Sequence, residues 1–352
     1  MLVTIVSFLA ILGLLVFVHE LGHFLVAKWA RIRVLEFGFG YPPRLVTLFR
    51  HKGTEYTLNL LPIGGFVRML GEEDPSHPES LAAQPPAVRA AVLLAGPLMN
   101  IWLAVLLFAL LGVVGVPAGP FTGRVEIVGV AEASPAAEAG LEVGDVILYV
   151  AGQRVSHTQQ VQSIVLKFRE RPITITVERN GELIDLTLTP RADPPRRQGW
   201  LGVEIINQRT TVRYDPVRAI LFGLRETGRV VRLVVQGVAQ IIEGTARTDV
   251  AGPLGIAQVT GELAREGRFI TLVNFAAFLS VNLAILNLLP FPALDGGRLL
   301  FVLLEWVRGG KRVDPQKEGL VHFIGMIVLL SLMLFITYFD VLRLFSGESI
   351  LR

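Results

Sequence analysis

The sequence predicts a polytopic α-helical membrane protein with about four transmembrane helices, a membrane-associated β-hairpin loop and an inserted α+β domain. Hydrophobic residues make up 52% of the 352 residues and charged residues only 18%, and the mean hydropathy is +0.55. Soluble domains carry more charge than this. Several apolar stretches are also long enough to span a bilayer, so the chain is expected to reside in a membrane.

We expect the first span within residues 1–30. This stretch lacks the basic leader of a secretory signal, which favours a retained helix over a cleaved peptide. The remaining spans are expected at residues 87–116, 269–295 and 321–340. They leave a long segment between the second and third spans, where the inserted domain is expected.

Basic residues in the short loops predict the orientation. Arginine and lysine gather in the loops 31–86 and 296–320, and short loops rich in these residues stay in the cytoplasm. The N-terminus, the inserted domain and the C-terminus are then expected outside the cytoplasm. The net charge of +3 and the lack of a basic tract interleaved with aromatics exclude nucleic acid as an expected partner.

The loop 31–86 is rich in β-branched and aromatic residues. We expect strands at 34–41 and 55–67, with turns at Pro42-Pro43 and at 62–65. The loop is apolar enough to dip back into the membrane, where an open edge strand could pair with an extended peptide. A small sheet that only caps the helices explains the pattern equally well.

Residues 121–190 predict a small α+β domain outside the cytoplasm. Strands are expected at 124–131, 146–150, 173–178 and 183–189, with a helix at 158–168 and a hairpin turn at Asn180-Gly181. The run from Ser134 to Ile147 resembles the bacterial PDZ family, which implies a groove for a peptide or chain end. A size filter without a ligand is the alternative of equal weight, and His157 is expected to be an ordinary groove or surface residue.

Residues 191–268 are expected to connect this domain to the third span. A linker rich in proline and arginine covers 191–198, and an amphipathic helix covers 214–244. The helix has apolar residues at three-four spacing and arginines on another face. It is expected to lie on the membrane surface or to pack against the bundle.

The first span contains the pattern His19-Glu20-Leu21-Gly22-His23. Residues four apart share one face of a helix, so both imidazoles can bind one metal ion, and Glu20 lies beside them as a candidate general base. Zinc is expected, and the absence of cysteine leaves only nitrogen and oxygen donors. Two histidines that hydrogen-bond to neighbouring helices, without a metal, are the alternative.

Asp295 is the expected third ligand, at the end of the third span. It follows Pro290 and Pro292, which break the helix, and precedes two glycines expected to let the backbone turn. Spans one and three run in the same direction, which places Asp295 at the depth of the two histidines. An ordinary turn aspartate at the membrane interface is the alternative.

In combination these motifs resemble the site-2 proteases, most closely the bacterial regulator-of-sigma-E protease subgroup. The resemblance rests on the His19–His23 pattern, Gly64-Gly65-Phe66, the PDZ-like stretch and Leu294-Asp295-Gly296, and it covers nearly the whole chain. Residues 250–256 also resemble the family's segment ahead of the third helix. One departure is the single PDZ-like stretch, because some members of the subgroup have two.

The resemblance implies zinc ligands, a catalytic residue and substrate contacts. The implied ligands are His19, His23 and Asp295, and the implied catalytic residue is Glu20. The implied substrate-binding residues are Asn282, Asn287, Asn100, Gly64, Gly65 and Phe66. From the sequence alone, the asparagines are equally well explained as hydrogen bonds between helices.

The implied function is intramembrane proteolysis in the bacterial inner membrane. The expected substrate is a single-span membrane protein already shortened by a first protease, for example an anti-sigma factor, or a signal-peptide remnant. A metal-ion transporter and a non-catalytic, membrane-anchored PDZ scaffold are the alternatives. A transporter should show repeated halves, which the sequence lacks, and a scaffold gives Glu20 no role.

Overall fold

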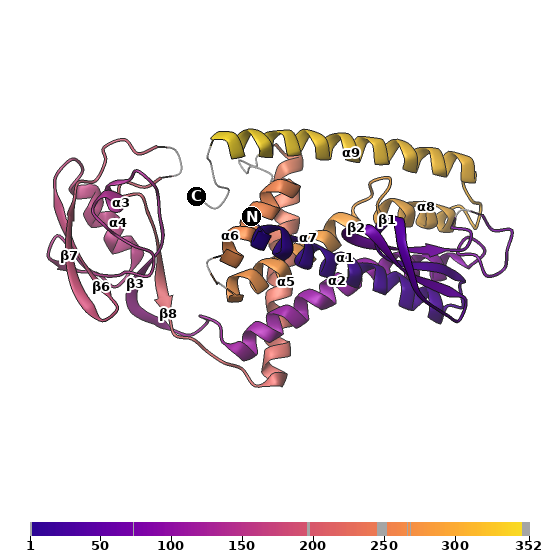
Figure 1. The fold of residues 1–352 in the computed structure, drawn as a ribbon, viewed down its shortest axis with the longest axis horizontal. Coiled ribbons are helices and arrows are strands. Elements are labelled where there is room, and N and C mark those ends of the chain that lie inside the picture. Colours follow the sequence, from indigo (N-terminus) through magenta and orange to yellow (C-terminus); the bar gives the residue numbers. More distant parts are fainter. Residues whose placement is uncertain are drawn as a thin grey trace. The chain divides into compact units, whose positions relative to one another are not determined.

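A computed structural model gives the structure of the chain. It describes residues 2–72, 74–195, 198–244, 252–265, 267 and 269–346. The chain divides into two compact units. Among the described residues, the membrane unit lies within 2–113 and 214–346, and the inserted unit lies within 114–213. Figure 1 shows the elements of each.

Four helices of the membrane unit are long and apolar enough to cross a bilayer, counted over the described residues. They are α1 (Leu2–Trp29), α2 (Pro86–Val114), α7 (Phe269–Leu288) and α9 (Pro315–Ser346). The expected multi-pass architecture is thereby confirmed. The span expected to reach residue 295 ends at Leu288, because Pro290 disfavours a helical conformation in the residue before it and cannot continue the helix itself.

A long antiparallel hairpin, β1 (Val34–His51) and β2 (Thr54–Met69), connects α1 to α2. The turns predicted at Pro42-Pro43 and residues 62–65 are wrong, because both segments lie inside the strands, where shifts of register absorb them. The actual turn is Lys52-Gly53, whose φ angles are 46° and 76°. Positive φ at both central residues is typical of a type I′ hairpin turn.

Aromatic side chains attach the hairpin to α1. The ring of Phe37 lies 5.9 Å from that of Phe17 and 5.1 Å from that of Phe24, and the rings of Phe39 and Phe17 stack at 5.4 Å. Such pairs contribute about 0.5–1.5 kcal/mol each beyond the area they bury. They hold the hairpin through β1 against α1, and β2 also lies beside this helix, as Figure 1 shows.

The described part of the membrane unit contains three further helices. The amphipathic helix expected at 214–244 is present as α5 (Pro216–Ile242), and two helices were not expected, α6 (Pro253–Arg265) and α8 (Asp295–Val307). The two residues at the start of the family-like segment 250–256 lie outside the described residues. Of the rest of the segment, Gly252 precedes α6 and residues 253–256 form its start.

The glycines after Asp295 do not form the predicted turn, because they lie in the first turn of α8. A Cβ atom on Gly296 would overlap the carbonyl groups of Leu288 and Leu289, and one on Gly297 would overlap that of Phe291. Glycine is therefore needed here for close packing against the end of α7. The tight packing fixes the position of Asp295 relative to α7.

The last helix, α9, is exposed along most of its length. Asp340 is one of its few buried polar residues, and its carboxylate accepts hydrogen bonds from the backbone amides of Gly252 (3.3 Å) and Gly255 (2.9 Å). These amides lie at the start of α6, so Asp340 supplies the cap of that helix. A buried polar contact thus joins α9 to the start of α6.

The inserted unit is an antiparallel sheet with two helices. Its sheet runs in the order β7-β6-β4-β3-β8, and a short strand β5 pairs with β4. The elements are β3 (Phe121–Val130), α3 (Pro135–Glu138), β4 (Val146–Val150), β5 (Gln153–Arg154), α4 (Thr158–Lys167), β6 (Ile173–Arg179), β7 (Glu182–Leu188) and β8 (Val203–Arg209). The strands and the helix expected between residues 121 and 190 are all present.

One strand of this unit, β8, was missed. The sequence predicts that the domain ends at residue 190 and that a linker covers 191–198, of which residues 196 and 197 lie outside the described residues. β8 pairs with β3 from Phe121 to Val130, so the unit extends to Arg209. No residue of β8 is fully buried, which explains why its apolar signal was weak.

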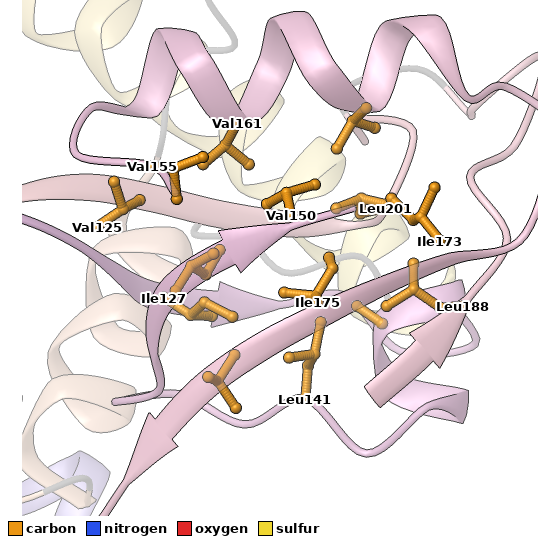
Figure 2. Close-up of a cluster of buried hydrophobic side chains, with 14 of the residues drawn as sticks. Val125, Ile127, Leu141, Val150, Val155, Val161, Ile173, Ile175, Leu188 and Leu201 are labelled. Carbon is orange, nitrogen blue, oxygen red and sulfur yellow. The ribbon is translucent and has the colours of Figure 1, made fainter. Parts of the chain in front are cut away.

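The core of the inserted unit lies between the sheet and α4. Figure 2 shows the side chains that fill it. Val161, Ile164 and Val165 project from α4 onto Ile127 and Val150 of the sheet. Fully burying a side chain of this kind contributes about 1.5–3 kcal/mol, so this cluster stabilises the unit.

Arg179 and the buried Asp145 form an ion pair at the edge of this core. Arg179 donates to the carboxylate of Asp145 through Nε (2.7 Å) and Nη2 (2.8 Å), and the amide of Glu142 donates to it at 2.9 Å. Burial alone would raise the pKa of Asp145, but these hydrogen bonds outweigh it and hold the pKa below its ordinary value. The pair therefore stabilises the folded state when Asp145 is ionised.

We predict that Asp145→Asn lowers the free energy of unfolding of the inserted unit by about 2 kcal/mol at pH 7. An unfolded aspartate titrates near pH 3.9, so this contribution is present above that pH and is lost as the pH falls toward the lower folded pKa. Urea unfolding of the full chain in detergent at pH 7 and pH 3 measures both effects. Asp193→Asn, at an exposed position, is the control, and an equal loss at both pH values would exclude the ion pair as the cause.

Candidate metal centre

The residues expected to bind zinc come together in the membrane unit. Nε2 of His19 and Nε2 of His23 lie 3.2 Å apart on α1. Oδ2 of Asp295, the first residue of α8, lies 3.0 Å from the former and 3.3 Å from the latter. Both histidines are 6% exposed. Two imidazoles and one carboxylate thus form a buried triangle of donor atoms.

The triangle fits a zinc ion. Tetrahedral zinc with bonds of about 2.0–2.1 Å separates its ligand atoms by roughly 3.3 Å, which is close to the three distances in this triangle. Oδ2 of Asp295 is moreover buried without a hydrogen-bond partner among the described residues. A buried carboxylate oxygen is costly in that state, and a bound cation would satisfy it. Two nitrogens and one oxygen are a donor set that zinc accepts.

The backbone of α2 fixes the orientation of His23. Nδ1 of His23 lies 2.7 Å from the carbonyl oxygen of Val92, so Nδ1 carries the hydrogen and donates it. The lone pair of Nε2 is then directed toward the metal position. Partners of this kind on the second ring nitrogen are usual for metal-binding histidines.

Asn100 lies beside Nδ1 of His19, as the carbonyl group of Val92 lies beside Nδ1 of His23. Its side-chain nitrogen lies 3.3 Å from Nδ1 of His19, and its Oδ1 is buried with no partner among the residues described. Turning the amide over exchanges the two atoms, and Oδ1 then accepts the hydrogen of Nδ1. Asn100 is completely buried, and the hydroxyl of Ser280 donates to the backbone carbonyl oxygen of Asn100 at 2.8 Å.

Two glycines allow α1 and α2 to approach closely at the centre. A Cβ atom on Gly22 would overlap the carbonyl oxygen of Ala95, and one on Gly96 would overlap Nε2 of His23 and lie 2.8 Å from Cε1 of His19. The space occupied by the imidazoles therefore exists because residue 96 has no side chain. Small residues at helix crossings are typical of membrane proteins.

Glu20 reaches the hairpin. The amide of Val67 in β2 donates to Oε2 of Glu20 at 3.1 Å. Gly65 also lies close, because a Cβ atom there would be 3.9 Å from Cγ of Glu20. The glutamate between the two histidines is thus held at the edge of a β-strand.

The predicted substrate-binding residues occupy three different places. A Cβ atom on Gly64 would contact Val16 of α1, so the Gly64-Gly65-Phe66 segment lies against the helix of the histidines. Asn282 and Asn287 lie on α7 and are partly buried, and their side-chain amides make no hydrogen bond with another described residue. Asn100 lies behind His19 and is inaccessible.

Sequence reasoning missed three contributors to the centre: Gly96, the carbonyl of Val92 and the amide of Val67. Gly96 could have been noticed as a glycine followed by Pro97 within an apolar span. The two backbone groups gave no signal, because any residue except proline supplies them.

Comparison with known proteins decides the assignment. The family model described as peptidase family M50 matches residues 7–332. The chain belongs to peptidase family M50. The match includes both histidines, the inserted unit and Asp295, and it confirms the expected site-2 protease family. The sigma-E subgroup and the PDZ identity of the inserted unit stay predictions.

Several relatives of this M50 peptidase are named as zinc metalloproteases. Zinc metalloprotease RasP from Geobacillus kaustophilus is 33% identical over 97% of this chain and 98% of the relative. The regulator of sigma-W protease RasP from Bacillus subtilis is 30% identical over 97% of this chain and 99% of the relative. A protein of Agrobacterium fabrum, provisionally named as a zinc metalloprotease, is 35% identical over 96% of this chain and 95% of the relative.

The M50 peptidase is therefore a membrane zinc metalloprotease whose expected cofactor is Zn²⁺. This assignment argues against the transporter and scaffold alternatives. Among solved structures, an HtrA-type protease with a decapeptide matches 22% of this chain and 23% of its own, at 32% identity and a TM-score of 0.20. So short a match does not establish the fold of either unit.

We predict that Gly96→Ala prevents tight zinc binding by the M50 peptidase. The new methyl group would displace His23 from the carbonyl of Val92 and remove the space used by both imidazoles. Zinc content after purification, measured by atomic absorption, should fall from about one per chain to a small fraction. Gly13→Ala in α1, where a Cβ atom meets nothing within 4 Å, is the matched control and should retain zinc. Full zinc content in Gly96→Ala would contradict the packing described.

Proposed function

We propose that this M50 peptidase hydrolyses a peptide bond within the transmembrane segment of another membrane protein. His19, His23 and Asp295 are the zinc ligands, and Glu20 is the catalytic residue. The observation that carries the proposal is the convergence of the ligand triangle and Glu20 inside apolar helices, next to an edge of the hairpin.

The location of the centre favours a substrate that is itself within the membrane. The two histidines lie on a candidate span, and the residues before them are apolar. A helical substrate in lipid hides its peptide bonds in internal hydrogen bonds. It must therefore unwind locally before a peptide bond can reach the zinc position.

β2 and α7 provide groups that could hold the unwound substrate. The segment Gly64–Val67 lies beside Glu20 and could pair with an extended strand by β-augmentation. The side-chain amides of Asn282 and Asn287 have no hydrogen bond with the described residues, and both residues are partly exposed. In the proposal, these two side chains donate hydrogen bonds to the carbonyl oxygens of the unwound substrate and accept hydrogen bonds from its amides.

Glu20 moves the proton in the proposed reaction. When bound, zinc supplies a Lewis acid that polarises the scissile carbonyl and lowers the pKa of water. Glu20 takes a proton from the attacking water and delivers it to the leaving amine. The amide of Val67 holds one oxygen of Glu20, Oε2, so the other oxygen is directed to the reaction. His23 and His19 keep their orientation through Val92 and Asn100.

We place the loops 31–86 and 296–320 in the cytoplasm, with the inserted unit outside. Their basic residues support this orientation. Contacts between them also support one common side, because Arg298 of α8 pairs with Glu72 at 2.8 Å. Arg89 at the start of α2 pairs with the buried Glu305 of α8. The active site then lies toward the cytoplasmic side.

The inserted unit, in this proposal, controls which substrates reach the membrane site. As a PDZ-like domain it would bind an extended peptide or chain end, and as a filter it would exclude proteins with large outside domains. The relative from Bacillus subtilis is named a regulator of sigma-W protease. By analogy, we propose as substrate a single-span protein, such as an anti-sigma factor, that has already lost most of its outside domain.

Reconstitution with a labelled single-span peptide tests the proposed function. Wild type should cleave the peptide, and Glu20→Gln should lose at least about 100-fold in rate, as expected for loss of a general base, while retaining zinc. Restoration of cleavage by zinc after chelation should be seen for wild type only. Equal cleavage by both proteins, or no cleavage by zinc-loaded wild type of any truncated single-span peptide, would contradict the proposal.

We predict that Asn287→Ala and Asn100→Ala fail differently. The first should raise KM by about 3–30-fold, which corresponds to a loss of roughly 0.6–2 kcal/mol, and leave zinc affinity unchanged. The second should weaken zinc binding by about 10–100-fold, because it removes the partner of His19. Chelator competition and steady-state kinetics separate the two effects. Loss of zinc affinity in Asn287→Ala would exclude its substrate role.

A further inference from the structure

We propose that His322 of α9 is a positioning residue for Asp295, and that it acts through the backbone of Ala293. The proposal rests on the assignment of Asp295 as a zinc ligand. α9 carries none of the three ligands. The bond between His322 and the loop that carries Asp295 nevertheless makes the helix part of the metal centre.

His322 points into the protein from a helix that is otherwise exposed. It is 9% exposed, whereas its neighbours Val321 and Phe323 are 39% and 55% exposed. Its ring lies 5.3 Å from that of Phe301 in α8. A polar side chain buried at membrane depth is costly and usually has a specific partner.

The partner is the backbone amide of Ala293, which donates to Nδ1 of His322 at 3.0 Å. Accepting this bond requires a neutral imidazole with its hydrogen on Nε2. Nε2 faces Glu318, whose Oε1 lies 4.0 Å away on the preceding turn of α9. The tautomer that the bond needs is therefore the one that the surroundings favour.

Ala293 adopts a strained conformation. Its φ angle is 76°, a region that residues other than glycine enter at a cost of about 1–3 kcal/mol. Such a conformation persists only where contacts hold it, and the hydrogen bond to His322 is one of them. Ala293 lies two residues before Asp295, so its conformation sets the direction in which the chain enters α8.

Gly325 adds a second contact between α9 and this loop. A Cβ atom on Gly325 would overlap Pro292 and lie 2.8 Å from its carbonyl oxygen. Gly325 and His322 are three residues apart, so they share one face of α9. Pro292 packs against Gly325, and the amide of Ala293 is hydrogen-bonded to His322. Loss of the hydrogen bond should let Oδ2 of Asp295 leave the triangle of donor atoms.

Two isosteric substitutions separate the hydrogen bond from the bulk of the ring. The side-chain oxygen of His322→Asn occupies the position of Nδ1 and can accept from Ala293, whereas the amide of His322→Gln reaches the position of Nε2 and cannot. We expect His322→Gln to weaken zinc binding by about 10–100-fold and His322→Asn to stay within about threefold of wild type. Chelator competition on the purified full chain measures both.

A second readout needs neither zinc nor substrate. Hydrogen exchange of residues 289–294 in metal-free protein reports on few amides, because Pro290 and Pro292 have none. Exchange at Ala293 should accelerate in His322→Gln and stay slow in His322→Asn. Phe323→Leu, on the exposed side of α9, is the matched control and should resemble wild type in both measurements.

Wild-type zinc affinity in His322→Gln would overturn the proposal, as would equal losses in the asparagine and glutamine variants, since the hydrogen bond would then not be the cause. The failure of the proposed function is distinguishable from these outcomes. If Glu20→Gln still cleaved substrate while the two His322 variants differed in zinc affinity and exchange, the positioning role would stand and the proteolytic mechanism would not.

Discussion

The close crossing of α1 and α2 at Gly22 and Gly96 is the constraint on which the metal centre depends. Polar groups in a lipid-embedded helix need partners, since no water is present to satisfy them. The crossing brings α2 near enough for Val92 and Asn100 to reach the two imidazoles. A larger residue at either glycine would separate the helices, and the ligands would lose both their orientation and their space.

The same rule organises the rest of the membrane unit. Helices in lipid associate through close packing and interhelical hydrogen bonds, so buried hydrogen bonds contribute to the choice of packing arrangement. Val67 holds Glu20, Asp340 caps α6, and Ala293 is held by His322. Each of these contacts joins a side chain on one element to the backbone of another. Glu20 and the loop before Asp295 are thereby both held by elements that carry none of the residues of the donor triangle.

The sequence predicted the four candidate spans and the shared face of His19 and His23 because those signals are local. Apolar length identifies a span, and the spacing of His19 and His23 identifies a shared face. It did not predict α8, because Gly296 and Gly297 are poor helix formers. Their role is to allow close packing against the end of α7 and the loop that follows it. The hairpin turn was misplaced for a related reason: prolines and glycines within β1 and β2 are accommodated by register shifts that only pairing reveals.

X-ray absorption at the zinc edge tests the central claim most directly, on the full chain in detergent. The account predicts one zinc per chain with two imidazole nitrogens and at least one oxygen at about 2.0–2.2 Å, and loss of one oxygen ligand or of the metal in Asp295→Ala. An unchanged spectrum in Asp295→Ala, or zinc bound without the two imidazoles, would contradict it.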